Sequence, residues 1–272
     1  MKKSVKILLI ILISLLIVIV VGKTYMLKNL EKSMLETYPD KVSPLDSLAF
    51  KNLSFEVGDR EIFASYIETD DPSKALFICM GNGETLYEWK PVQVFLYEKG
   101  FSSFVFTYSG FGNSTGKPTI NNLNKDVHAA YQKFIELTPN TKERIAVSNS
   151  LGGAPLIKMI NKFEPAPSKL IIYATFSSVR DILVDMDMFS SGTVWIFPDV
   201  WNSKKSLKKI DIPTYLFHSK IDSTIPVVNA HRLMEYASSG TELILLEQFE
   251  HNELYKQNFE DLWHIILDKI SE

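Results

Sequence analysis

Residues 145–153 read Ile-Ala-Val-Ser-Asn-Ser-Leu-Gly-Gly, and they are the most informative part of the sequence about the fold. The apolar start indicates a buried strand, and the small residues around Ser150 indicate a sharp turn into a helix. Such a turn holds a serine hydroxyl clear of the sheet, and the helix N-terminus offers backbone N–H groups to a developing negative charge. We therefore predict that Ser150 is a nucleophile. A Gly- and Ser-rich turn without chemistry is the alternative.

Short apolar runs alternate with helical patterns on both sides of this stretch. Two alternating runs, 50–57 and 61–67, flank Gly58-Asp59 and predict a hairpin. Nearly all-apolar runs, typical of parallel strands buried on both faces, follow at 75–80, 104–106, 145–147, 170–173, 215–217 and 243–246. Helical patterns lie at 86–98, 124–137, 151–163, 227–237 and 254–270. The sequence predicts an α/β fold with a mostly parallel open sheet, an antiparallel N-terminal hairpin and helices on both faces.

Two further strand ends carry residues suited to proton transfer. Asp222 follows the run 215–217, and His251 follows the run 243–246. Histidine moves protons near neutral pH, and a carboxylate can orient its ring. Taken singly, Asp222 could cap a turn and His251 could be an inert loop residue. Serine, acid and histidine in this order, each beyond a separate strand, are less expected by chance than any single match.

A glycine-flanked turn, Gly81-Asn82-Gly83, follows the strand predicted at 75–80. It can aim a backbone N–H at the same point as the N–H of Leu151, and two such donors form an oxyanion hole. It could equally be a plain turn. It is too short for a dinucleotide or P-loop site.

From about Leu48 to the C-terminus, the sequence resembles the α/β-hydrolase superfamily. It is most similar to the membrane-anchored, single-domain branch that contains serine esterases, lysophospholipase-like and acyl-protein-thioesterase-like proteins. That branch has His-Gly-Asn-Xaa-Gly after its third strand, where residues 80–83 read Met-Gly-Asn-Gly. It has Asp-Tyr-Arg-Gly-Tyr-Gly-Xaa-Ser-Xaa-Gly after its fourth strand, where residues 107–116 read Thr-Tyr-Ser-Gly-Phe-Gly-Asn-Ser-Thr-Gly.

The resemblance implies a role for five residues. Ser150 is the nucleophile, Asp222 the orienting acid and His251 the base, and the backbones of Asn82 and Leu151 are the oxyanion donors. No metal or organic cofactor is expected. The departures from the family patterns are Met80 for His, Thr107 for Asp, Ser109 for Arg, and Ser148 for the first glycine of the turn around Ser150. None removes a member of the triad, but they leave loop geometry and substrate polarity open.

The N-terminus resembles a membrane anchor. A basic leader, 1–6, precedes the almost wholly apolar residues 7–22, which with Val5 approach the roughly 17–20 residues of a membrane span. A cleaved signal peptide has the same layout, but no Ala-Xaa-Ala site follows. We predict an uncleaved anchor, with a stalk or first helix over 23–47 and the hydrolase domain over 48–272. The basic leader should stay in the cytoplasm, giving a single-pass protein of the cell membrane with an extracytoplasmic catalytic domain.

Composition narrows the functional classes. The 272 residues are 46% apolar with a net charge of −3, which suits one large domain and gives no basic excess for nucleic-acid binding. The single cysteine, Cys79, excludes an internal disulfide framework and a cysteine-based structural zinc site.

The segment 175–209, between the predicted strands 170–173 and 215–217, is where this fold inserts a lid. It is rich in aromatic and methionine side chains, which suggest an acyl-chain or otherwise apolar substrate unless they only pack the lid. Its lysines, Lys204, Lys205, Lys208 and Lys209, form either a solvated loop or a contact with anionic lipid headgroups.

The sequence therefore predicts a membrane-anchored serine hydrolase that cleaves carboxylic esters or thioesters of a small-molecule or lipid-like acyl substrate through an acyl-enzyme. A serine peptidase on the same fold and a non-catalytic binding protein are the alternatives.

Overall fold

The computed structural model describes residues 3–35, 37–39 and 50–271. Much of the predicted stalk beyond residue 35, and the start of the predicted domain at 48, lie outside the described residues.

Eight strands form one sheet in the order β1-β2-β4-β3-β5-β6-β7-β8. Their bounds are β1 (Phe50–Val57), β2 (Arg60–Ile67), β3 (Lys74–Cys79), β4 (Ser102–Phe106), β5 (Glu143–Asn149), β6 (Lys169–Tyr173), β7 (Thr214–Ser219) and β8 (Thr241–Leu246). β1 pairs antiparallel with β2, and β2 pairs antiparallel with β4. The pairs from β4 to β8 are all parallel. This confirms the predicted mostly parallel sheet with an N-terminal hairpin.

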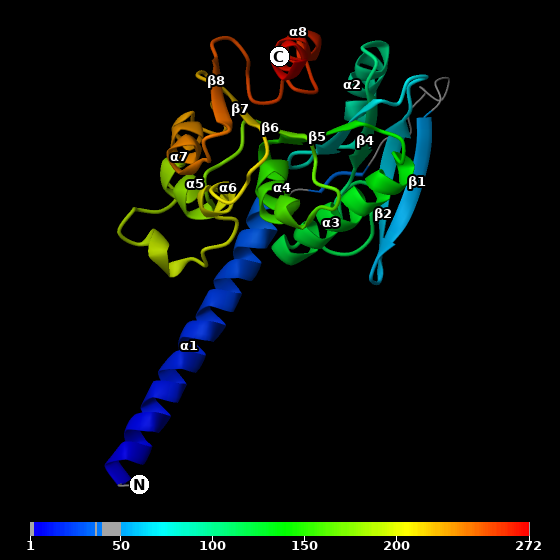
Figure 1. Ribbon diagram of the computed structural model, residues 1–272. Helices are drawn as coiled ribbons and strands as arrows, with labels where there is room; N and C mark the ends of the chain where they lie inside the picture. The colour runs from blue at the N-terminus through cyan, green and yellow to red at the C-terminus, as the bar shows by residue number, and fades with distance from the viewer. Residues whose placement is uncertain (1–2, 36, 40–49, 272) are drawn as a thin grey trace.

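Helices cover both faces of the sheet (Figure 1). The helices that follow the hairpin are α2 (Leu86–Glu98), α3 (Ile120–Leu137), α4 (Gly153–Met159), α5 (Val179–Asp185), α6 (Ser203–Leu207), α7 (Val228–Tyr236) and α8 (Phe259–Ser271). Side chains of a strand alternate between faces. In β3, Phe77 joins the core under α3 and α4, whereas Leu76 and Ile78 join the core under α2 and α8. Because both faces are buried, the strands are nearly all apolar.

Helix boundaries differ from the sequence-based prediction where a cap or a turn intervenes. The helix predicted from residue 124 begins at Ile120, because the Thr119 side chain caps its N-terminus. The helix predicted from residue 254 begins at Phe259, because the preceding residues form turns and Asn258 has a φ of 59°. Leu254 and Tyr255 are buried within those turns. In the sequence, their apolar side chains could not be distinguished from those of a buried helix face. The helix predicted at 151–163 is α4 flanked by two short 3₁₀ turns.

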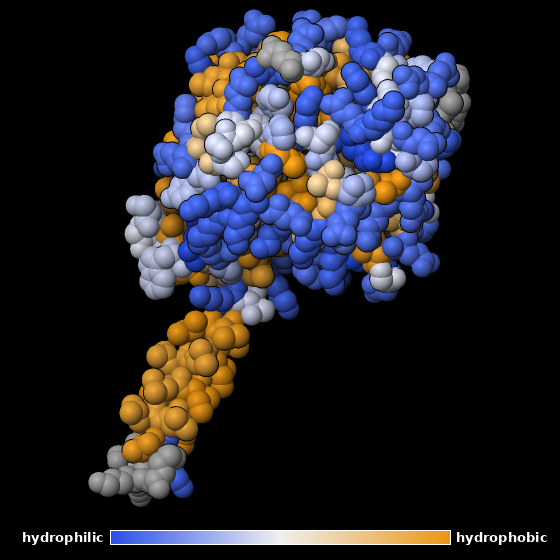
Figure 2. All heavy atoms as spheres, in the orientation of Figure 1, coloured by the Kyte–Doolittle hydropathy of each residue, from blue (hydrophilic) through white to orange (hydrophobic). Residues whose placement is uncertain are grey.

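One long helix, α1 (Lys3–Met34), precedes the sheet. It projects from the domain as a rod (Figure 1), and the exposed length of this rod is mostly apolar (Figure 2). Residues 5–34 form a helix long and apolar enough to cross a membrane. The helix continues beyond the predicted anchor, and Leu30 and Leu35 are buried in the same core cluster as α3 and α4. The first part of the predicted stalk is therefore a helical extension that packs into the domain.

Candidate active site

Ser150 lies at the junction of β5 and α4 in a strained backbone conformation. Its φ is 47°, in the left-handed region that side chains other than glycine rarely adopt and that is found mainly where function requires it. A Cβ at Gly152 would lie 2.4 Å from the backbone oxygens of Cys79 and Met80. A Cβ at Gly153 would lie 2.5 Å from Oγ1 of Thr175. The glycines after Ser150 are therefore required by the close approach of this turn to the ends of β3 and β6.

Three of the predicted site residues form one chain of hydrogen bonds. The Nε2 atom of His251 lies 2.8 Å from the Ser150 hydroxyl, and its Nδ1 atom lies 2.7 Å from Oδ2 of Asp222. An ionised carboxylate can only accept hydrogen bonds, which assigns the proton of a neutral ring to Nδ1 and leaves Nε2 to accept from Ser150. The structure thus brings together a hydroxyl, an imidazole and a carboxylate from three separate strand ends.

The loop that carries Asp222 holds its carboxylate from the other side. Oδ1 of Asp222 accepts hydrogen bonds from the backbone N–H groups of Thr224 and Ile225, at 2.9 and 2.8 Å. Asp222 and His251 are buried, with 7% and 6% of their surfaces exposed. The carboxylate is therefore oriented by backbone donors as well as by the ring, which restricts its rotation.

A second histidine faces the same carboxylate. His218, at the end of β7, has its Nε2 atom 2.8 Å from the carbonyl oxygen of Ile225 and 3.6 Å from Oδ2 of Asp222. Burial lowers the pKa of His218, which favours the neutral ring with a proton on Nε2 for the Ile225 carbonyl. In the sequence, His218 only continues the apolar run of a predicted strand, and nothing there marks it as part of the site. The structure places it as a support for the Asp222 loop.

The two residues predicted to supply oxyanion donors lie on adjoining loops. Leu151 directly follows Ser150, and Asn82 lies just beyond the end of β3. The close approach of Gly152 to the Cys79 and Met80 carbonyls brings these loops together. The Asn82 side chain donates a hydrogen bond of 2.8 Å to the Met34 carbonyl at the end of α1. The donation of their backbone N–H groups to an oxyanion remains a prediction.

Glu84 is a buried residue of this site that sequence reasoning missed. Its carboxylate accepts hydrogen bonds from the Asn149 side chain, directly before Ser150, and from the Trp89 indole N–H at 2.7 Å. Burial raises its pKa to about 7, against hydrogen bonds from Gly81, Trp89 and Asn149 that lower it. Glu84 therefore joins the loop after β3 to the serine turn. In the sequence, Glu84 is only a glutamate beside a glycine-rich turn. Because glutamates are mostly exposed, nothing there indicated that it is buried.

A buried arginine compensates for one departure from the family pattern. Where that pattern has an arginine, this chain has Ser109, and Arg60 of β2 donates to its hydroxyl at 2.6 Å. Arg60 also forms a buried ion pair of 3.1 Å with Asp126, which in turn accepts from the Ser109 backbone N–H. The Arg60 guanidinium, which comes from β2, thus holds the loop that contains Ser109. Its origin in the hairpin could not be inferred from local sequence.

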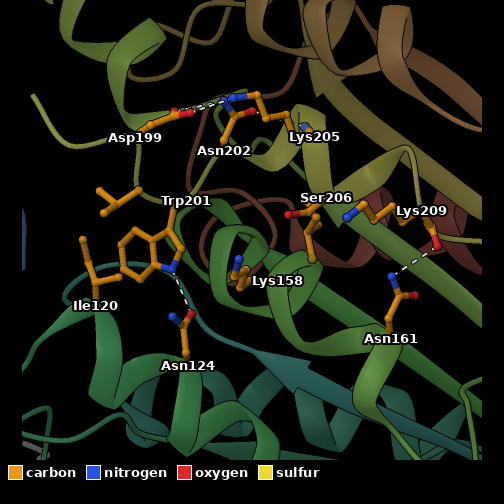
Figure 3. A pocket seen from close by; sticks show the side chains of 12 residues that line it. Ile120, Asn124, Lys158, Asn161, Asp199, Trp201, Asn202, Lys205, Ser206 and Lys209 are labelled. Atoms are coloured by element: carbon orange, nitrogen blue, oxygen red, sulfur yellow. Dashed lines mark hydrogen bonds and ion pairs between the residues drawn. The ribbon is translucent and has the colours of Figure 1, made fainter. Parts of the chain in front are cut away.

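Two cavities lie beside α4 and beside the loop after β3, respectively, and the first of them borders the lid segment (residues 175–209), which includes α5 and α6. One, of about 440 Å³, lies between α3, α4 and α6. Lys158 and Lys209 extend into it, the Trp201 indole donates to Asn124, and Lys205 pairs with Asp199 (Figure 3). Another, of about 560 Å³, is lined by Asn82 and by Asn252, the neighbour of His251. The second cavity therefore adjoins the hydrogen-bonded residues.

Within the described ranges, no group of three or more His, Cys, Asp or Glu side chains is placed to hold a metal ion.

The chain is similar in sequence to several known proteins. Residues 70–205 match the family model Hydrolase_4, serine aminopeptidase S33. The chain is 26% identical over 204 residues to the uncharacterized membrane protein YNL320W of Saccharomyces cerevisiae, covering 74% of this chain and 71% of that protein. It is 24% identical over 236 residues to the uncharacterized protein YfhR of Escherichia coli, covering 83% of this chain and 82% of that protein.

Solved structures share the fold. An esterase of Pyrococcus furiosus superposes with a TM-score of 0.68 at 17% identity, covering 86% of this chain and 94% of that chain. The match of the family model over residues 70–205 extends across β3 to α6, including Ser150. The chain therefore belongs to the serine aminopeptidase S33 family of α/β hydrolases.

Proposed function

We propose that this protein is a membrane-anchored serine hydrolase that cleaves carboxylic esters or thioesters. The observation that carries the proposal is the hydrogen-bonded series Ser150, His251 and Asp222, with distances of 2.8 and 2.7 Å. Hydrogen-bonded contact between a hydroxyl and a base that is itself oriented by a third group is the arrangement that activates a serine. The apolar helix α1 supports the anchoring.

In this proposal, His251 Nε2 accepts the proton of Ser150 as the serine oxygen bonds to the substrate carbonyl carbon. The carbonyl oxygen becomes negatively charged, and the backbone N–H groups of Asn82 and Leu151 stabilise it. As the bond to the leaving oxygen or sulfur breaks, His251 returns the proton to that atom. Water then attacks the acyl carbon and gives a proton to the same nitrogen. The bond from that carbon to the Ser150 oxygen breaks, His251 returns the proton to this oxygen, and the carboxylic acid is released. Asp222 stabilises the charged ring in both steps.

An active-site serine probe tests this proposal. A fluorophosphonate should label the wild type and should not label Ser150→Ala. Ser148→Ala is a matched control, because the Ser148 hydroxyl is buried two residues away and has no hydrogen-bond partner among the described residues. Equal labelling of the wild type and Ser150→Ala would exclude Ser150 as the nucleophile, and absence of labelling in folded wild type would favour a non-catalytic binding protein.

Peptide hydrolysis is the second candidate, because the matching family model is that of a serine aminopeptidase. The proposed mechanism serves both bond types, so the distinction is kinetic. Turnover of p-nitrophenyl acyl esters and of aminoacyl anilides should be compared on the full chain. We expect kcat/KM to be higher for the esters, and the reverse order would assign the site to a peptidase.

We further propose that α1 crosses the cell membrane once and that the catalytic domain lies on the extracytoplasmic side. The basic leader before the apolar stretch supports this orientation. A membrane-impermeant amine reagent applied to intact cells should modify lysines of the domain. If the lysines of the domain react only after the cells are lysed, the domain lies on the cytoplasmic side.

A further inference from the structure

An apolar cavity of about 500 Å³ lies between α1 and the lid segment. Met26 and Leu30 line it from α1 together with Tyr25, Asn29, Lys32 and Ser33, and the lid lines it with apolar side chains alone: Leu183, Met188, Phe189 and Phe197. The Phe189 and Phe197 rings meet edge to face with centroids 4.4 Å apart. Met188 keeps 55% of its surface exposed, although it is a large apolar side chain. A contiguous apolar surface of this kind commonly marks a site that binds a membrane or an apolar ligand.

The cavity lies close to the apolar part of α1. Its α1 residues lie between Tyr25 and Ser33, just after the almost wholly apolar stretch that ends at Gly22. At a rise of about 1.5 Å per residue, Met26 is roughly 6 Å beyond Gly22, which is about the thickness of one headgroup layer. With the apolar part of α1 in a bilayer, the mouth of the cavity lies at the membrane surface, where Lys23, Lys28 and Lys32 surround the helix.

The same helix joins the cavity to the proposed catalytic residues. Leu30 lines the cavity, and one turn later the Met34 carbonyl accepts the hydrogen bond from Asn82. Leu30 also belongs to the same buried cluster as Leu151, the neighbour of Ser150. On another side, Glu31 accepts a hydrogen bond of 2.9 Å from the Ile120 backbone N–H at the start of α3. The end of α1 therefore contacts the loop that carries Asn82, one of the two predicted oxyanion donors.

We propose that this cavity binds the fatty acyl chain of a membrane lipid and directs its ester carbonyl toward Ser150. The inference rests on the proposed serine hydrolysis and adds the substrate class and the route of entry. Its apolar lining and its volume suit a hydrocarbon chain, and its position allows the chain to leave the leaflet without crossing water. Each methylene that enters should raise kcat/KM about fourfold until the cavity is full.

A pair of methionines in the lid provides a matched test. Met186 and Met188 are 53% and 55% exposed, and only Met188 lines the cavity. The full chain in lipid nanodiscs should be assayed with butyryl and palmitoyl esters. Met188→Glu should lower kcat/KM for the palmitoyl ester at least tenfold and leave the butyryl ester within twofold, and Met186→Glu should change neither. An equal effect of Met188→Glu on both esters, or no effect, would overturn the proposal.

A binding measurement separates this proposal from the proposed chemistry. Ser150→Ala protein in nanodiscs should be irradiated with a fatty acid that carries a diazirine, and the crosslinked peptides identified by mass spectrometry. We expect crosslinks within residues 25–33 and 183–197, which Met188→Glu abolishes and Met186→Glu retains. Crosslinks elsewhere would refute the acyl-chain site. Crosslinks here without probe labelling of the wild type would refute the serine mechanism alone.

Discussion

The carboxyl edge of the sheet and the junction between α1 and the lid hold their residues by different means. At the sheet edge, directional hydrogen bonds link Ser150, His251 and Asp222 to one another and link Glu84 to Asn149, and the side chains of His251, Asp222 and Glu84 are buried. At the junction, contacts are mainly apolar, and Met188 remains more than half exposed. Hydrogen bonds depend on distance and angle, whereas apolar contact is non-directional. Changes at the edge should therefore abolish chemistry, and changes at the junction should alter which substrate is used.

The largest effect is expected from Asp222→Asn. The amide that replaces the carboxylate can donate from its N–H₂ group to Nδ1 of His251, which favours the tautomer with the proton on Nε2. A protonated Nε2 atom cannot accept the proton of Ser150. We expect kcat to fall about 10⁴-fold for short and long esters alike, measured under substrate saturation. A loss of activity confined to long-chain esters would mean that Asp222 affects the choice of substrate, as expected of the junction residues, and not the chemical step.

Gly152→Ala should be the most destabilising small change at the sheet edge. Its Cβ would lie 2.4 Å from two backbone oxygens, of Cys79 and Met80, so the serine turn and the loop after β3 must separate. We expect a loss of about 3 kcal/mol in unfolding free energy, or roughly 6–12 °C in melting temperature. Gly240→Ala is the control, because no atom lies within 4 Å of its Cβ. Equal melting temperatures for the two variants would contradict the close packing.

Glu84 should make the stability of the sheet edge depend on pH. Its pKa is raised from 4.5 to about 7 in the folded protein, so its contribution is fully present below about pH 4.5 and is lost as the pH rises through 7. The change is on the order of 3 kcal/mol. The melting temperature of the wild type should therefore fall relative to that of Glu84→Gln as the pH rises from 5 to 8.

Glu98→Gln, at the exposed end of α2, serves as the control for this titration and should show no such trend. A difference between the wild type and Glu84→Gln that stays constant from pH 5 to pH 8 would mean that Glu84 does not titrate in this range.

The smallest effect is expected from the lysines of the cavity in Figure 3. Lys158 and Lys209 line that cavity with no acidic partner among the described residues, whereas Lys205 pairs with Asp199. Each of Lys158→Ala and Lys209→Ala should weaken binding of the full chain to anionic vesicles about fivefold, since a lysine near such a surface contributes about 1 kcal/mol.

Lys142→Ala, at the amino end of β5, is the matched control for these two variants. If Lys158→Ala and Lys209→Ala bind anionic vesicles as well as Lys142→Ala does, neither Lys158 nor Lys209 contacts anionic lipid.

The sequence determined those features that depend on local patterning. Apolar runs set the strands, and glycine and serine around Ser150 marked the turn that the structure has. In the sequence, Ser150, Asp222 and His251 each follow a separate apolar run. Because the carboxyl ends of parallel strands lie at one edge of the sheet, this pattern predicted that the three residues lie near one another. Burial on both faces makes such runs visible without knowledge of their neighbours.

Only the tertiary structure decided which distant side chains meet. The contact between Asn82 and the end of α1, the burial of Glu84 against Asn149, and the approach of Arg60 to Ser109 join residues far apart in the chain. None leaves a periodic signal, because each depends on how the crossovers stack β2, β3 and β5 in the sheet rather than on local preference. The apolar spacing at Leu254 was wrong as a helix start for the same reason, since burial in a turn and burial on a helix face select the same side chains.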